Sequence, residues 1–191
     1  MYKISISERT LHFKQPAGTS RGVYTTRHSY YLHLTSDEAP SVEGVGECAT
    51  LPDLSCDAKP EYEVTLRQIC QMVEQMGRIP YDMIRAYPSI TFGLETAFAS
   101  FFEAVRSKHL LATHGDAAGQ DTIAVPAWAQ NLASLYDSPF ARGEEGITIN
   151  GLVWMGTYEE MLARLEEKLK AGFHCVKLKI GAIDFFKELD L

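Results

Sequence analysis

Hydrophobic and polar positions alternate over the first 48 residues of the chain. Tyr2, Ile4 and Ile6 alternate with polar residues, and residues 24–34 are rich in Tyr and Thr. Alternation with a period of two is typical of strands that bury one face. We expect a small three-stranded antiparallel meander, with a glycine-bearing loop at 16–22 and a short third strand at 43–48.

The spacing of apolar residues then changes to three and four. Residues 64–76 carry an apolar stripe that ends at Gly77, and a second stripe starts at about Ser89, directly after Pro88, and continues to Val105. This spacing predicts two amphipathic helices, because 3.6 residues make one helical turn. Strands followed by helices predict an α+β unit.

The last part of the chain predicts a strand, a helix and a second strand in succession. Residues 147–154 have a strand pattern, Thr157 and Glu160 form a capping-box signature, residues 161–170 are helical, and 175–180 form the second strand. Such a unit is a right-handed parallel crossover, from which barrels and doubly wound sheets are built. We place an α+β domain with its crossover segment at 1–146 and the second domain at 147–191.

Two lysines share one face of the second strand of this crossover. Side chains alternate along a strand, so Lys177 and Lys179 lie on one face, and Val176 and Leu178 lie on the other. Parallel sheets are usually covered on both faces, so helices would pack on the apolar face and the lysines would point to the interior. Solvated lysines are the alternative. Interior amines near a strand's carboxyl end are candidates for a general base and for stabilising negative charge.

Composition and charge narrow the classes of function. With 191 residues, 46% hydrophobic and 23% charged, the chain is typical of a soluble protein of one or two domains. The net charge of −7 argues against nucleic acid as a partner. No apolar run is long enough to span a membrane, so we expect no membrane partner. Four cysteines without a Cys-x-x-Cys pair indicate reduced thiols, and we expect a cytoplasmic protein.

Several segments together resemble a known family, the muconate-lactonizing branch of the enolase superfamily. These segments are Gly44-Val-Gly-Glu-Cys48, Leu51-Pro-Asp-Leu-Ser55, Pro88 to Ala97 and Lys177-Leu-Lys179. Residues 150–156, together with 51–55, are most similar to the o-succinylbenzoate synthases of menaquinone biosynthesis. The resemblance implies an α+β capping domain followed by the first strands of a (β/α)7β-type barrel, truncated at the end of this chain.

The resemblance also implies a reaction. Lys179 would be the base that removes the proton α to a carboxylate and then the acid that delivers it to the leaving hydroxyl, a syn dehydration. Lys177 would help to stabilise the enolate. The substrate is a small carboxylate, and Mg²⁺ binds its carboxylate group. The metal ligands come from later barrel strands, so we expect the 191-residue chain alone to be inactive and none of its residues to be a metal ligand.

Two loops of the capping domain would close over the substrate. They are residues 18–22 and 51–55, and the substrate-binding residues predicted from them are Ser20, Arg21, Leu54 and Ser55. Arg21 would contact a substrate carboxylate, although an exposed loop arginine is usually solvated. Ser55 would equally serve as a turn or helix-capping residue.

Other functions remain open at this point. The branch also contains dipeptide epimerases, N-acylamino acid racemases and muconate cycloisomerases, although epimerases tend to carry a threonine-rich loop where this chain has residues 51–55. A non-enzymatic binding or assembly module with solvated lysines is an alternative from another class. A dinucleotide-binding fold is a weaker one, because no Gly-x-Gly-x-x-Gly follows either strand of the crossover. The resemblance also allows a homo-oligomer.

Overall fold

A computed structural model describes residues 1–19, 22–112, 125–133, 138–181 and 183–191. The chain divides into two compact units. We call Met1–Ala17 with Tyr24–Arg142 the sheet-and-helix unit, and Gly18–Val23 with Gly143–Leu191 the crossover unit. Each is described by itself.

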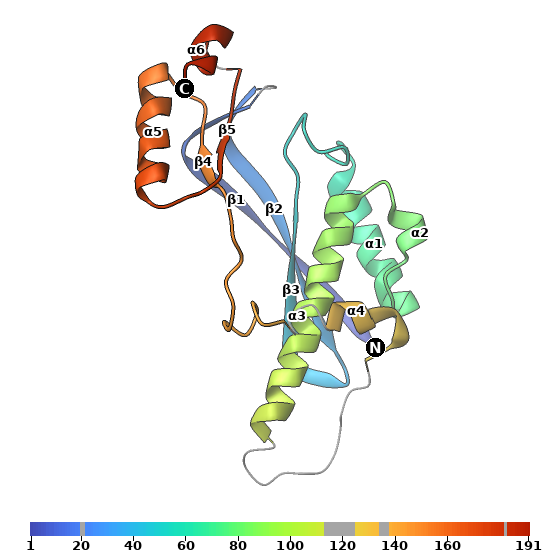
Figure 1. Cartoon of the computed structure of the whole chain (residues 1–191). Helices are drawn as coiled ribbons and strands as arrows, with labels where there is room; N and C mark the ends of the chain where they lie inside the picture. Colours follow the sequence, from blue (N-terminus) through green and yellow to red (C-terminus); the bar gives the residue numbers. More distant parts are fainter. Residues whose placement is uncertain (20–21, 113–124, 134–137, 182) are drawn as a thin grey trace. The chain divides into compact units, whose positions relative to one another are not determined.

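The sheet-and-helix unit is built on a three-stranded sheet (Figure 1). The strands are β1 (Tyr2–Thr19), β2 (Gly22–Ser36) and β3 (Ala39–Ala49), in that order across the sheet. β2 and β3 pair antiparallel, with Leu32 opposite Gly46. The alternation in the sequence thus produces a sheet with one apolar face, on which Leu32 and Leu34 are fully buried.

Helix α3 (Pro88–Ala112) approaches β3 closely because glycines line both sides of the contact. A side chain at Gly44 would overlap the carbonyl oxygen of Ala97, and one at Gly46 would overlap that of Gly93. A side chain at Gly93 would in turn overlap the sulfur of Cys48. Glycine is the residue that permits backbones to approach so closely.

Helices α1 (Tyr62–Met76) and α3 pack on the apolar face of the sheet, and the short helix α2 (Tyr81–Ile84) packs against α3. Helix α1 ends as the sequence predicts, because Gly77 adopts a left-handed φ of 64° and its N–H bonds to the carbonyl of Val73. The core between sheet and helices includes residues that are at most 1% exposed: Leu32, Leu34, Leu66, Val73, Ile84, Ile90, Leu94, Phe98 and Phe101.

A short helical segment packs beside α3. It consists of the 3-10 helix η1 (Ala127–Ala129) and α4 (Gln130–Ala133). The Trp128 ring meets the Phe98 ring edge-on, with 4.9 Å between centroids. Arg106 of α3 donates a hydrogen bond to the carbonyl of Ala133. Residues 127–133 are therefore helical and add to the core.

The crossover unit contains two parallel strands and a helix between them in sequence. They are β4 (Gly151–Val153), α5 (Tyr158–Lys170) and β5 (Val176–Leu178), followed by α6 (Phe185–Leu189). The capping box is present, because the Thr157 hydroxyl accepts from Glu160 N–H and the Glu160 carboxylate accepts from Thr157 N–H. The predicted fold class, a capping domain followed by the first barrel strands, agrees with this architecture.

Element lengths differ from the sequence predictions in three places. β1 continues to Thr19, through much of the predicted loop. β4 is limited to three residues where the sequence predicts a strand over residues 147–154, since only Gly151–Val153 have partners on β5. Helix α2 is absent from the sequence predictions, because four residues are too few to show a helical period. Among the described residues, no helix is long and apolar enough to cross a membrane.

Candidate functional site

The two predicted catalytic lysines lie at the end of β5. Lys177 is exposed and pairs with Leu152 of β4, and Lys179 directly follows the strand and is half-buried. The Lys179 N–H donates to the carbonyl of Val153 at 3.0 Å, which continues the parallel ladder by one residue. Both lysines therefore project from the same face of the sheet, as alternation predicts.

Helix α5 covers the opposite face of these strands. Val153 of β4 and Met161 of α5 are fully buried. A Cβ at Gly151 would lie 3.1 Å from Cβ of Lys168, so helix and strand are packed at close range. The turn into the helix is held by Arg164, whose guanidinium donates to the carbonyl of Trp154 at 3.0 Å and to that of Met155 at 3.1 Å. The lysine face is thus the face that α5 leaves open.

Trp154 provides a contact for Lys179 that sequence reasoning missed. The Lys179 Nζ lies over the indole ring, 5.5 Å from its centroid. A cation above an aromatic face is attracted by the ring quadrupole, with about 0.5–1 kcal/mol at exposed sites. Extending the register of Leu152 with Lys177 by two residues places Trp154 opposite Lys179. The contact between Trp154 and Lys179 could therefore be found from the parallel register, but only once the pairing of β4 with β5 is known.

The loop Leu51–Ser55 lies in the sheet-and-helix unit and is closed on itself. Ser55 N–H donates to the carbonyl of Leu51 at 3.0 Å, and Leu51 N–H donates to the Ser55 hydroxyl at 3.0 Å. Asp53 adopts a left-handed φ of 61° at the turn. Leu54 is 38% exposed. Ser55 therefore holds the loop, and its hydroxyl proton can still be donated to another group.

Two further contacts fix this loop in the sheet-and-helix unit. The Tyr24 hydroxyl donates to the carbonyl of Pro52 at 2.9 Å, which joins β2 to the loop. Behind the loop, the buried carboxylate of Asp57 accepts from the N–H of Ser89 at 2.8 Å and from its hydroxyl at 2.6 Å. Asp57 thereby anchors the loop's exit to the first turn of α3. The predicted residues Ser20 and Arg21 lie outside the described residues.

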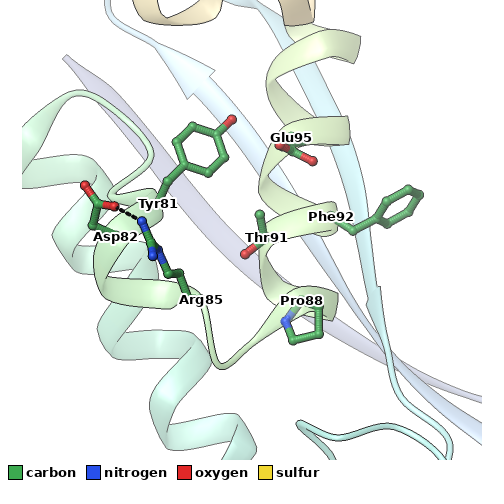
Figure 2. Close-up of a pocket in the computed structure, with 7 residues that line it drawn as sticks. All are labelled: Tyr81, Asp82, Arg85, Pro88, Thr91, Phe92 and Glu95. Carbon is green, nitrogen blue, oxygen red and sulfur yellow. Dashed lines mark hydrogen bonds and ion pairs between the residues drawn. The ribbon is translucent and has the colours of Figure 1, made fainter.

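A separate pocket of about 490 Å³ opens between α2 and α3 (Figure 2). Its lining residues are Tyr81, Asp82, Arg85, Pro88, Thr91, Phe92 and Glu95. Burial and the neighbouring Glu95 carboxylate raise the pKa of Tyr81 to about 12, so its hydroxyl stays protonated near neutrality. The pocket contains none of the predicted site residues.

Comparison with known proteins finds a relative of the kind that the motifs resemble. No family model matches the chain. The o-succinylbenzoate synthase of Desulfotalea psychrophila is 31% identical over 220 residues, which span 99% of this chain and 52% of the relative. The chain therefore spans about half the length of this curated relative.

Solved structures show the same fold. An o-succinylbenzoate synthase from Thermosynechococcus elongatus, complexed with Mg in its active site, is 21% identical with a TM-score of 0.54. The match covers 99% of this chain and 45% of that structure. A mandelate racemase/muconate lactonizing protein from Herpetosiphon aurantiacus is 14% identical with a TM-score of 0.60, covering 97% and 46%. This chain therefore shares its fold with about half of each of these structures.

The described residues do not form a metal centre. Within residues 1–19, 22–112, 125–133, 138–181 and 183–191, no three His, Cys, Asp or Glu side chains gather to hold a metal ion. Mg²⁺ prefers several oxygen ligands in octahedral geometry. The residues present therefore do not fit this ion, and we assign no metal ligand to them.

Proposed function

We propose that the protein containing these 191 residues is an o-succinylbenzoate synthase-like lyase of menaquinone biosynthesis. It would remove the proton α to a carboxylate and then eliminate a hydroxyl group on the same side. The similarity to the Desulfotalea psychrophila synthase along nearly the whole chain supports this choice. Mg²⁺ would belong to the complete enzyme, as in the Thermosynechococcus elongatus structure.

One observation carries the proposal: two amines project from the face of β4 and β5 that α5 does not cover, at the strands' carboxyl ends. This is the end at which barrel enzymes place their active sites. A lysine amine in its neutral form is a competent base, and a second ammonium stabilises an enolate by its charge. We assign Lys179 as the base and subsequent acid, and Lys177 as the group that stabilises the enolate.

The contact between Lys179 and Trp154 supports this division of roles. The indole ring restricts where the Lys179 amine can lie, and a base must be held within reach of its proton. Lys177 is exposed and, in the described residues, its amine has no recorded hydrogen bond, ion pair or ring contact. The better-held amine is the one assigned to proton transfer.

The loop Leu51–Ser55 and residues 18–22 would enclose the substrate. Leu54 is an exposed, large apolar side chain of the first loop, and we propose that it contacts the apolar part of the substrate. Ser55, Ser20 and Arg21 would supply polar contacts, with Arg21 facing a carboxylate. Tyr24 and Asp57 would hold the first loop in position.

The test measures α-proton exchange and dehydration separately in the complete protein. The cyclohexadiene carboxylate substrate is incubated with Mg²⁺ in D₂O, and deuterium at the α carbon and o-succinylbenzoate are both quantified. We expect Lys179→Ala to lose both activities by about 10²- to 10⁴-fold, the usual contribution of a general base. Lys177→Arg keeps a positive charge and should lose less.

Lys170→Ala is the matched control, because Lys170 is an exposed lysine of the same unit, paired with Glu166 on the surface of α5. It should keep full activity. A Lys179→Ala enzyme with more than a tenth of the original rate would contradict the role of Lys179. Exchange without dehydration would instead favour a racemase or cycloisomerase, the second candidate, whose fold the chain shares equally.

A further inference from the structure

Three side chains on the sheet of the sheet-and-helix unit form a continuous hydrogen-bonded chain. The Ser7 hydroxyl of β1 lies 2.8 Å from Nε2 of His33 on β2. The other ring nitrogen of His33, Nδ1, lies 2.8 Å from Oε1 of Glu43 on β3. A hydroxyl, an imidazole and a carboxylate thus stand in the order used by enzymes that activate a serine nucleophile.

The hydrogen bond to Glu43 sets the tautomer of His33. A carboxylate only accepts hydrogen bonds, so the proton of the neutral ring must lie on Nδ1. Nε2 then carries the lone pair and faces the Ser7 hydroxyl. This is the orientation in which the ring can accept the hydroxyl proton. The carboxylate would also stabilise the imidazolium that forms.

Ser7, His33 and Glu43 lie on the sheet face opposite α3. On β3, Gly44 and Gly46 face the helix. Successive residues of a strand point to opposite faces, so Glu43, next to Gly44, points away from the helix. His33 is 30% exposed between the fully buried Leu32 and Leu34. Ser7 is exposed as well, so a small molecule can reach its oxygen.

Alternation along β1 also places a cation on this face. Arg9 follows Ser7 by two residues, which corresponds to about 7 Å along a strand, and its side chain is exposed. A guanidinium at this distance can reach an oxyanion that develops next to Ser7. The arrangement therefore supplies a nucleophile, a base, an orienting carboxylate and a stabilising charge.

A second set of a hydroxyl, a histidine and a carboxylate lies on the same sheet and differs from the Ser7 set in its geometry. On the other face of the sheet, Thr10 lies 3.2 Å from Nδ1 of His28, and Glu8 lies 3.1 Å from Nε2. In this second set the hydroxyl contacts Nδ1 and the carboxylate contacts Nε2, the reverse of the Ser7 set. Both of its distances are longer, and its hydroxyl belongs to a threonine, which is more hindered than serine. Only the Ser7 set has the short contacts and the nitrogen order described above.

We propose that Ser7 is an activated nucleophile that accepts acyl groups from small activated esters, such as aryl acetates. Its Oγ attacks the ester carbonyl carbon while the hydroxyl proton moves to Nε2 of His33. The bond to the aryloxy group then breaks, and the phenol leaves with that proton. Water then attacks the acyl carbon of the acyl-serine as His33 takes one of its protons. The bond from the acyl carbon to Oγ breaks, the carboxylic acid leaves, and the proton passes from His33 back to the Oγ of Ser7. No oxidant or cofactor is needed.

The experiment uses the full 191-residue chain and two reagents, p-nitrophenyl acetate and a fluorophosphonate. The fluorophosphonate forms an Oγ–P bond as fluoride and the serine proton leave together. We expect peptide mass spectrometry to find the adduct on Ser7, and p-nitrophenol release to be lost in Ser7→Ala. His33→Gln and Glu43→Gln should slow labelling of Ser7, by about 100-fold for His33→Gln.

Ser5 is the matched control, because it is exposed on the same strand and the same face and, in the described residues, its hydroxyl has no recorded hydrogen bond. Ser5→Ala should label and hydrolyse as the unchanged chain does. Equal labelling of Ser5 and Ser7, or a labelling rate unchanged in His33→Gln, would overturn the proposal and leave the three side chains as a structural hydrogen-bond chain. Circular dichroism of each variant separates loss of reactivity from loss of fold.

Discussion

Asp57 shows how strongly one buried side chain can bind two segments together. It is 1% exposed, and its Oδ2 accepts both hydrogen bonds from Ser89, whose hydroxyl also contacts the Tyr62 hydroxyl at 2.6 Å. Asp57→Ala removes the buried acceptor of the partly buried Ser89 donors, so we expect the free energy of unfolding in urea to fall by about 1–3 kcal/mol. Asp57→Asn keeps an acceptor and should lose less. Asp82→Asn is the control, because this carboxylate is 88% exposed, and it should change the free energy of unfolding by less than about 0.5 kcal/mol. Equal losses at Asp57 and Asp82 would refute the argument.

At the scale of elements, the contact between α3 and β3 depends on glycine. A methyl group at Gly46 would overlap the Gly93 carbonyl oxygen, which belongs to the helix backbone and cannot rotate away. We expect Gly46→Ala to destabilise the protein by about 1–3 kcal/mol, as overpacking does, and to lower Tm in a thermal melt followed by circular dichroism. Gly146→Ala is the control, since no atom lies within 4 Å of the position that its methyl group would take. A Gly46→Ala melt that coincides with the control would mean that α3 can shift freely.

For the whole molecule, burial of protonated groups predicts sensitivity to alkaline pH. Burial raises the pKa of Cys70 to about 12 and raises those of Cys48 and Tyr62 further still. These groups ionise at lower pH in the unfolded chain than in the folded one. Their contribution to the free energy of unfolding is therefore complete below about pH 9 and is lost as the pH rises toward 12. Each group contributes up to about 1.4 kcal/mol per pH unit in that window. Urea unfolding at pH 8 and pH 10 measures the loss, and Cys70→Ala should make the slope shallower. A slope that is the same in Cys70→Ala would contradict this assignment.

Local signals predicted the ends of helices better than the lengths of strands. Gly77 and the Thr157–Glu160 box act through hydrogen bonds within a few residues, and both appear as predicted. Strand length depends on a partner, so β1 extends to Thr19 and β4 shrinks to three residues. For the candidate site, alternation placed Lys177 and Lys179 on one face, while Trp154, Tyr24 and Asp57 are recognisable only from contacts between distant segments.

Sequence patterns alone predicted the periods of most elements, the end of α1 at Gly77, the capping box of α5, the shared face of the two lysines and the motifs that resemble the enolase superfamily. These properties follow from spacing and local hydrogen bonding, which act over a few residues. Three features became visible only in the folded protein: α5 leaves the lysine face open, glycines permit α3 to approach β3, and Ser7, His33 and Glu43 meet across three strands. Those contacts join residues far apart in the chain, and their geometry comes from strand register and packing.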